Sequence, residues 1–308
     1  MLITPPHLAN LFAGFKTAFN KGLESTESTY LKLAMEVPSD GREETYPWLG
    51  QWPGLREWVG ERILNNLVLH GFTIKNRDFE STVEIPRTDN ADDKYAVFTP
   101  MFTNIGAQTK RHPDVMVYEL LSRGFEEKGY DGAPFFSAAH PGKNAAGQAA
   151  THSNMQDGDG PAWFLIDGSK PLKPLVFQRR EDYRFTRMDA DNTENVFLHN
   201  RCIYGVNGRV NAGFALWQLA FGSKAPLTAE NYEAARAAMK GVRSDGDGRK
   251  LGVSPTLLVV PDELEGAGLR LINNDTRTVT VGTAPNETTV AAANEWKGTA
   301  ELIVSPFL

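Results

Sequence analysis

The chain has 308 residues, 41% hydrophobic and 23% charged, which is the ordinary balance of a globular protein with one large or two medium domains. With 32 Lys and Arg against 38 Asp and Glu, the net charge is −6, which argues against a dedicated nucleic-acid-binding protein. No apolar run approaches the roughly 20 residues that span a bilayer, no signal peptide is expected, and the single Cys202 cannot form an internal disulfide. Membrane-spanning, disulfide-stabilised and disordered proteins are therefore excluded.

The first predicted element is an amphipathic helix over residues 7–23. Its apolar side chains recur at steps of three and four residues, which places them along one face. They are Leu8, Leu11, Phe12, Phe15 and Phe19. Two surfaces could bury this face: the chain's own domain, or a neighbouring subunit on which the segment lies as an arm. The sequence leaves both open.

Residues 38–60 combine many glycines and prolines with three tryptophans, Trp48, Trp52 and Trp58. Glycine and proline at this density cannot continue a helix or a central strand, and tryptophans are costly to leave in water. The segment is therefore either a loop packed on its own core or an extended loop that inserts its aromatic rings into a partner. The sequence favours neither.

A β-hairpin is predicted next, with strands over 67–74 and 79–85, a turn at 76–78, and Pro86 ending the second strand. Both segments are rich in residues that favour strands, and the second alternates apolar and polar side chains.

Residues 92–128 change to a helical period. Proline inside a helix removes a hydrogen bond and clashes with the preceding turn, so Pro100 and Pro113 should kink this helix or divide it in two. Residues 137–161 are small and polar and predict a long surface loop.

The remainder mixes strands and helices without regular alternation. Strands are predicted over 163–166, 175–177, 195–198, 256–260 and 300–304, and helices over 228–242, with Thr228 as N-cap, and after Pro261. The pattern predicts an α+β fold, because a TIM barrel or a doubly wound sheet would alternate strand and helix.

Among motifs for catalysis and ligand binding, the sequence contains no phosphate-binding glycine loop and no nucleophile elbow. Cys202 lies in an apolar context that indicates an inert thiol. Asp131, His140 and His152 could bring imidazoles and a carboxylate around zinc, although their spacing matches no recognised ligand pattern. The Asp-Gly runs at 157–160 and 245–248 lack the closing Glu of an EF-hand and predict turns. We therefore expect no catalytic residue, cofactor or metal.

Eleven short stretches stand out by their order and spacing along the chain. They are YPWLG (46–50), LREWVGER (55–62), NRDFE (76–80), YDG (130–132), FF (135–136), HP (140–141), YGV (204–206), RVN (209–211), LTAENY (227–232), LGVSP (251–255) and ELIVSP (301–306). In these stretches, taken in this order, the chain resembles the major head subunit family of phage Mu and Mu-like prophages. The resemblance covers nearly the whole length, and it depends on order and spacing together.

The resemblance implies the tailed-phage major capsid fold of the Hong Kong ninety-seven type, an α+β fold with four parts. Residues 1–35 would form an N-terminal arm and 36–90 an extended loop and hairpin. Residues 91–135 would hold the spine helix of a peripheral domain. Residues 136–295 would build mainly an axial domain with returns to the peripheral domain, and the C-terminal strand within 296–308 would also return there.

The implied function is that of a major capsid protein, a non-enzymatic subunit that self-assembles into the icosahedral head shell around double-stranded phage DNA. Its expected partners are copies of itself in hexamers and pentamers, and a scaffold, a protease and a portal during assembly. The DNA would be enclosed without sequence-specific binding, and no membrane would be involved. The expected location is the virion, assembled in the cytoplasm of the host bacterium.

The predicted inter-subunit contacts are Trp48, Trp52, Trp58, Phe12 and Phe15, because large aromatic side chains are enriched among residues that dominate binding energy. Two alternatives remain open. One is another phage structural protein associated with the tail or portal. The other is a metal-assisted hydrolase that uses Asp131, His140 and His152.

Overall fold

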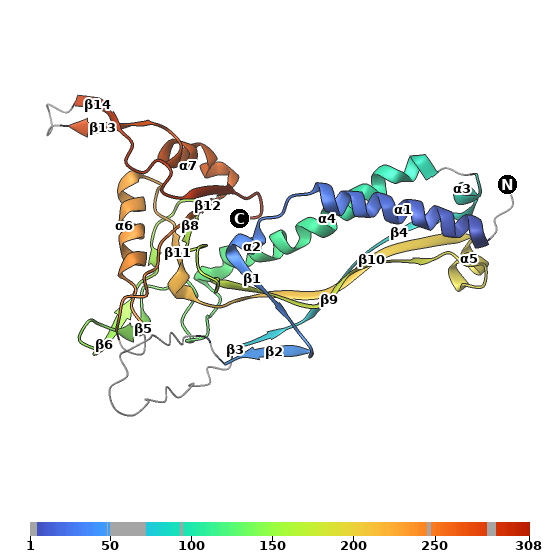
Figure 1. Ribbon diagram of the computed structural model, residues 1–308, viewed down its shortest axis with the longest axis horizontal. Helices are drawn as coiled ribbons and strands as arrows, with labels where there is room; N and C mark the ends of the chain where they lie inside the picture. The colour runs from blue at the N-terminus through green and yellow to red at the C-terminus, as the bar shows by residue number, and fades with distance from the viewer. Residues whose placement is uncertain (1–4, 48, 50–71, 93–94, 245–247, 282–287) are drawn as a thin grey trace.

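Two sheets and a pair of long helices divide the molecule into an elongated half and a broader half (Figure 1). The computed structural model describes residues 5–47, 49, 72–92, 95–244, 248–281 and 288–308, and every structural statement below concerns these residues. The N-terminal helix lies at the far end of the elongated half, and the C-terminus lies near the junction of the two halves.

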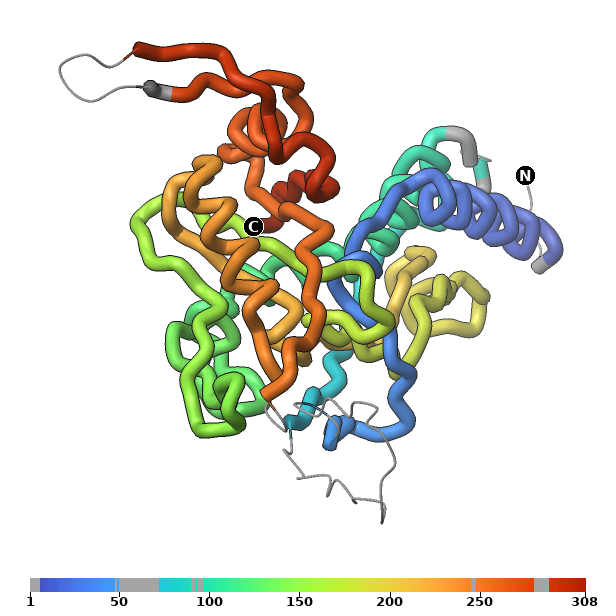
Figure 2. The backbone as a smooth tube through the Cα atoms, turned by 60° about the vertical axis from the view of Figure 1, so that its left-hand side comes forward, coloured from blue at the N-terminus to red at the C-terminus, as the bar shows by residue number. Residues whose placement is uncertain are grey.

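The elongated half is a four-stranded sheet covered by two helices. Its strands, in spatial order, are β1 (Ala34–Pro38), β9 (Leu175–Met188), β10 (Arg201–Phe214) and β4 (Arg77–Pro86). β1 runs parallel to β9, and the other two pairings are antiparallel. The helices α1 (Pro5–Ser25) and α4 (Tyr95–Ser122) lie side by side along the sheet in both views (Figures 1 and 2).

α1 and α4 touch backbone to backbone. A Cβ atom on Gly106 of α4 would lie 2.0 Å from the carbonyl oxygen of Phe19, and one on Gly22 of α1 would lie 1.9 Å from that of Thr103. Only glycine permits so close an approach, because it has no side chain to hold the helices apart. The contact therefore depends on these two positions.

The broader half is built on a five-stranded sheet. Its strands, in spatial order, are β15 (Glu301–Val304), β12 (Leu257–Val260), β8 (Trp163–Ile166), β11 (Ala220–Ser223) and β7 (Met155–Gln156). Every residue of β8 and β12 is buried, as expected for uninterrupted apolar strands covered on both faces. Helices α6 (Ala229–Gly241) and α7 (Glu265–Ile272) add Tyr232, Met239 and Ile272 to this core.

β9 and β10 connect the halves. The first four residues of β9, beginning at Leu175, are buried, whereas most of the strand beyond them is exposed or half-buried. At the paired end of β10, Phe214 stacks on Phe135 with ring centroids 4.3 Å apart. The two long strands therefore begin in the core of the broader half and extend along α1 and α4.

The shorter elements connect these layers or lie at their edges. The helical ones are α2 (Tyr30–Leu33), α3 (Arg87–Ala91), α5 (Glu194–His199) and the 3₁₀ turns η1 (Arg123–Phe125), η2 (Trp217–Leu219) and η3 (Asp262–Leu264). The two-stranded pairs are β2 (Glu43–Tyr46) with β3 (Phe72–Lys75), β5 (His140–Lys143) with β6 (Ala149–His152), and β13 (Thr276–Val281) with β14 (Thr288–Ala293).

Several local predictions are confirmed. The N-terminal helix spans Pro5–Ser25, and α6 begins after Thr228, whose hydroxyl oxygen accepts the backbone N–H of Asn231 at 3.3 Å. The strand predicted over 256–260 is β12. These elements carry their own signals in a periodic apolar face, a capping side chain or a continuous apolar run.

The predicted hairpin is wrong. β3 and β4 are separated only by Asn76, but β3 pairs with β2 and β4 pairs with β10. The Asn76 side chain anchors this transition, because its amide nitrogen donates to Ser39 Oγ at 2.8 Å and its amide oxygen accepts from Gln178 at 2.7 Å. Residues 67–71 of the predicted first strand lie outside the described residues.

Two predictions based on local composition are also wrong. The strand predicted over 195–198 is part of helix α5, which ends at Asn200 in a left-handed conformation with φ 53°. The predicted surface loop over 137–161 contains β5, β6 and β7. Within this segment, β5 pairs with the nearby β6, and β7 pairs with the distant β11.

α4 is continuous through both of its prolines. Pro100 and Pro113 lie inside a single helix of 28 residues, so the helix is not divided in two. Packing along α1 and the sheet offsets the lost hydrogen bonds, because Phe102, Val117 and Leu121 are all buried.

The C-terminal strand does not return to the sheet of the elongated half. β15 adds to the edge of the five-stranded sheet, parallel to β12, with Glu301 opposite Leu257. A single ion pair connects this strand to α2, where Lys32 Nζ lies 2.6 Å from Glu301 Oε1.

The close contact between α1 and α4 predicts a large loss of stability when a side chain is added at Gly106. Gly106→Ala should lower the free energy of unfolding by at least about 2 kcal/mol, because the methyl group would force α1 and α4 apart. Gly241→Ala is the matched control in another helix, since a Cβ there meets nothing within 4 Å. It should raise stability by about 0.5 kcal/mol. Urea unfolding of both variants checks this, and equal stabilities would contradict the contact.

Candidate functional site

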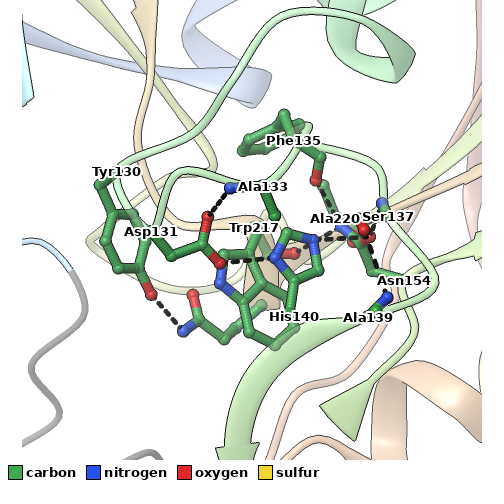
Figure 3. A network of polar contacts seen from close by, with 11 residues as sticks. Tyr130, Asp131, Ala133, Phe135, Ser137, Ala139, His140, Asn154, Trp217 and Ala220 are labelled. Atoms are coloured by element: carbon green, nitrogen blue, oxygen red, sulfur yellow. Dashed lines mark hydrogen bonds and ion pairs between the residues drawn. The ribbon is translucent and has the colours of Figure 1, made fainter.

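The candidate metal site is a buried polar cluster around His140, the first residue of β5 (Figure 3). The Nδ1 atom of His140 lies 2.6 Å from Asp131 Oδ2, and its Nε2 atom lies 3.1 Å from Asn154 Oδ1. Its ring stacks on Trp217 with centroids 4.0 Å apart and planes 6° from parallel. Both nitrogens of this imidazole are therefore engaged with oxygen atoms.

Asn154 is held in one orientation. Its amide nitrogen donates to the carbonyl oxygen of Phe135 at 2.8 Å, and its amide oxygen accepts the backbone N–H of Ser137 at 2.8 Å. The same oxygen must therefore face His140 (Figure 3). The imidazole of His140 is thus held between a carboxylate oxygen and an amide oxygen.

The structure brings the three predicted metal ligands near one another without forming a metal site. His152 lies opposite His140 in the β5–β6 pair, but its Nε2 atom lies 3.1 Å from the carbonyl oxygen of Lys143. Within the described parts of the chain, no group of three His, Cys, Asp or Glu residues is arranged to hold a metal ion. The geometry therefore gives the hydrolase alternative no metal centre.

The cluster instead fastens the segment between α4 and β8 to the core. Asp131 also accepts the backbone N–H of Ala133 at 3.2 Å, and Tyr130 Oη accepts from Gln218 Nε2 at 2.7 Å. The side chains of His140 and Asp131 are only 0% and 6% exposed. Each thus depends on the other as its buried partner.

The other candidates for chemistry also have structural roles or lie outside the described residues. Cys202 is buried in the core of the elongated half. The Asp-Gly run at 157–160 packs on the backbone of Lys224, where Gly160 N–H donates to its carbonyl oxygen at 2.9 Å. In the second run, residues 245–247 lie outside the described part.

The predicted inter-subunit residues divide into two groups. Trp48, Trp52 and Trp58 lie outside the described residues. Phe15 is fully buried in its own subunit, with its ring 4.2 Å from Phe102, so in this conformation it has no surface to offer a neighbour. Phe12 is half-buried and stacks on Phe185 at 5.5 Å. Of the two surfaces left open for the first helix, its own domain is the one it covers.

A second group of apolar side chains was not predicted from the sequence. Phe197 and Leu198 of α5 are 80% and 60% exposed, and Met188 at the end of β9 is 51% exposed. α5 lies at the outer end of the elongated half (Figure 1). The hydrophobic content around 195–198 is a usable signal of this surface, although the same residues predict a strand.

The contact between α4 and β9 contains a second notable histidine. His112 Nδ1 lies 2.6 Å from Tyr183 Oη, and its ring centroid lies 4.4 Å from that of Phe79. Burial lowers the pKa of His112, and the nearby Arg77 lowers it further against an opposing effect of Glu119. Burial raises the pKa of Tyr183, so its hydroxyl stays protonated and donates to the neutral ring.

The geometry described above defines an elongated molecule with polar clusters in its interior and exposed apolar side chains at one end. Within the described residues, no helix is long and apolar enough to cross a membrane. Residues 8–308 match the family model described as Mu-like prophage major head subunit gpT. The chain belongs to this family.

Two curated relatives match over essentially their full lengths. The major capsid protein of Escherichia phage Mu is 36% identical over 314 residues, covering 100% of both chains. The Mu-like prophage FluMu major head subunit of Haemophilus influenzae is 38% identical, covering 99% of both. The chain is therefore a major head subunit of the Mu-like type, as the sequence resemblance predicted.

Solved structures confirm the predicted fold class. A chain from the procapsid of bacteriophage JBD30 superposes with a TM-score of 0.83 at 36% identity, covering 99% of this chain and 100% of that one. A chain from the JBD30 capsid gives a TM-score of 0.75 at 26% identity, covering 100% and 99%. The α+β fold is thus that of a phage major capsid protein.

If the cluster around His140 is structural, substituting Asp131 should lower stability, and the purified protein should not depend on bound metal. Asp131→Asn should lower the free energy of unfolding by about 2 kcal/mol, because it replaces the buried carboxylate that contacts His140 Nδ1 and the backbone N–H of Ala133. The exposed Asp157→Asn is the control and should stay within about 0.5 kcal/mol of the wild type. Urea unfolding measures both. Stoichiometric zinc in the purified protein, lost in His140→Ala, would instead support a metal site.

The lowered pKa of His112 predicts a pH effect of definite sign. Because the unfolded chain takes up the proton first, stability from this residue is complete above about pH 6.5 and declines as the pH falls toward the folded-state pKa. Between pH 7 and 5, the wild type should therefore lose more stability than His112→Phe. Thermal unfolding at several pH values checks this, and parallel curves would contradict it.

Proposed function

We propose that this head subunit assembles as hexamers and pentamers into the icosahedral shell that encloses double-stranded phage DNA. The observation that carries the proposal is the full-length similarity to the JBD30 procapsid subunit, at a TM-score of 0.83 over 99% of the chain. A match of this extent includes both halves and their connecting strands. It therefore supports a subunit of the shell wall over a tail or portal protein that shares one module.

We assign two of the four parts of the capsid fold to the two halves. The elongated half, with α4 as its long helix, suits the peripheral domain, and the broader half suits the axial domain. β9 and β10 belong to the segment 136–295 but lie along α4, as expected for returns to the peripheral domain. Within the proposed extended loop, residues 36–90, strand β4 lies in the sheet of the elongated half, and residues 48 and 50–71 lie outside the described residues.

Two sets of apolar side chains are suited to contacts between copies, the first of them chosen from the sequence alone. We propose Trp48, Trp52 and Trp58 as the first set of inter-subunit contacts, because tryptophan is enriched at the centres of interfaces. The exposed patch of Met188, Phe197 and Leu198 at the end of the elongated half is the second. Exposed apolar groups of this size are costly in water and stabilise an assembly when a neighbour covers them.

A shell that encloses DNA needs partner proteins during its assembly. A scaffold, a protease and a portal would act during assembly in the cytoplasm of the host bacterium, and the finished shell would be part of the virion. The net charge of −6 suits a wall that encloses DNA without binding particular sequences, since like charges repel the phosphate backbone. We expect no catalytic turnover and no cofactor.

Electron microscopy of the purified protein, with light scattering on the same sample, tests the proposal. Shells, or capsomers with five- and six-fold symmetry, are the expected result. Rings with one fixed number of subunits would favour a portal-type protein. A chain that stays monomeric with a scaffold protein present would contradict the proposal.

Trp58→Ala tests the role of the extended loop. The variant should keep the unfolding temperature of the wild-type monomer, but its yield of particles should fall at least about tenfold as an interface anchor is lost. Trp58→Phe is the matched control and should retain most assembly, because it keeps an aromatic ring. Light scattering measures the yield. A normal yield for Trp58→Ala would count against the extended loop as an interface.

A further inference from the structure

The β13–β14 ribbon projects from the broader half beyond α7, and both views show it extending away from the rest of the chain (Figures 1 and 2). Among the residues that the structure describes, its strands pair only with each other, in a register that runs from Thr276 opposite Ala293 to Val281 opposite Thr288. A two-stranded ribbon on its own is at best marginally stable in water, and both of its outer edges offer unpaired backbone groups. A partner that covers it would therefore stabilise it.

The base of the ribbon is firmly attached. The buried Asn294 side chain donates to the carbonyl oxygens of Leu271 at 2.8 Å and Asn274 at 2.9 Å. Arg277 makes a bidentate ion pair with Glu295, at 2.8 Å and 2.5 Å. The direction in which the ribbon leaves α7 is therefore set by the fold of the subunit.

Beyond this base, the strands carry no charge, since Arg277 is the only charged residue in either strand. Val279, Val290 and Ala292 share one face with Arg277, and Val290 is 42% exposed. The opposite face carries Thr278, Thr289 and Ala291. Exposed edge strands are usually protected by lysine, proline or a bulge. The outer part of these strands has no lysine or proline, and its register is regular.

We propose that the face formed by Val279, Val290 and Ala292 packs against a second copy of this chain. This inference rests on the proposed self-assembly. The procapsid subunit of JBD30 matches 99% of the chain, so the ribbon belongs to the part that is shared with a shell subunit. Copies that each carry a charge of −6 repel one another, and the uncharged outer parts of the two strands allow them to meet without adding to this repulsion.

Two neighbouring substitutions on opposite faces test the assignment. Val290→Asp places a carboxylate in the proposed contact, whereas Ala291→Asp adds the same charge one residue away on the other face. Both positions are exposed in the subunit, so both monomers should keep the wild-type unfolding temperature. Val290→Asp should raise the subunit concentration needed for assembly at least about tenfold, and Ala291→Asp less than about twofold. Val290→Thr, which keeps the side-chain shape, should give an intermediate increase.

Three results would overturn the inference. Val290→Asp could assemble at the wild-type concentration, or both Asp variants could lose assembly equally. Val290→Asp shells could also form normally but fail to bind a separate decorating protein, which would assign the ribbon to that partner. If the wild type itself forms no particles, the proposed function fails and the inference falls with it. That failure differs from the others because it does not depend on the variants.

Discussion

The close approach of α1 and α4 is the constraint on which the elongated half depends. With glycine at positions 22 and 106, the two helix backbones come into contact, and the ring of Phe15 reaches both Phe102 and Tyr204 of β10. A long, thin sheet has little core of its own, so a closely packed helix pair supplies the buried surface that keeps it rigid. The N-terminal segment is thus an integral layer of the subunit.

The strands β9 and β10 connect the rigid elongated half to the broader half. Both strands have 14 residues, and their inner ends contribute Phe177 and Phe214 to the core where the halves meet. Displacing one half would disturb the packing of the other, because the same strands belong to both. The contacts that we propose with neighbouring copies lie on peripheral segments, at the end of the elongated half and on the β13–β14 ribbon.

Elements with local signals were predictable from the sequence, and those decided by distant partners were not. The apolar period of α1 and the Thr228 cap of α6 are readable in a few consecutive residues. The pairing of β3 and β4 was missed because Asn76 is held by Ser39 and Gln178, which are far away in the chain. For the candidate site, Asp131 and His140 were correctly placed together, but the ring contact with Trp217 that makes the cluster part of the core has no local signal.

Cryo-electron microscopy of particles assembled from the purified chain tests the central claim most directly, because it traces every subunit within its neighbours. The account predicts closed icosahedral shells in which α1 lies on α4 of the same subunit and peripheral segments make the contacts between copies. A map in which α1 crosses to the α4 helix of a neighbouring subunit, or in which the particles are rings, would contradict it.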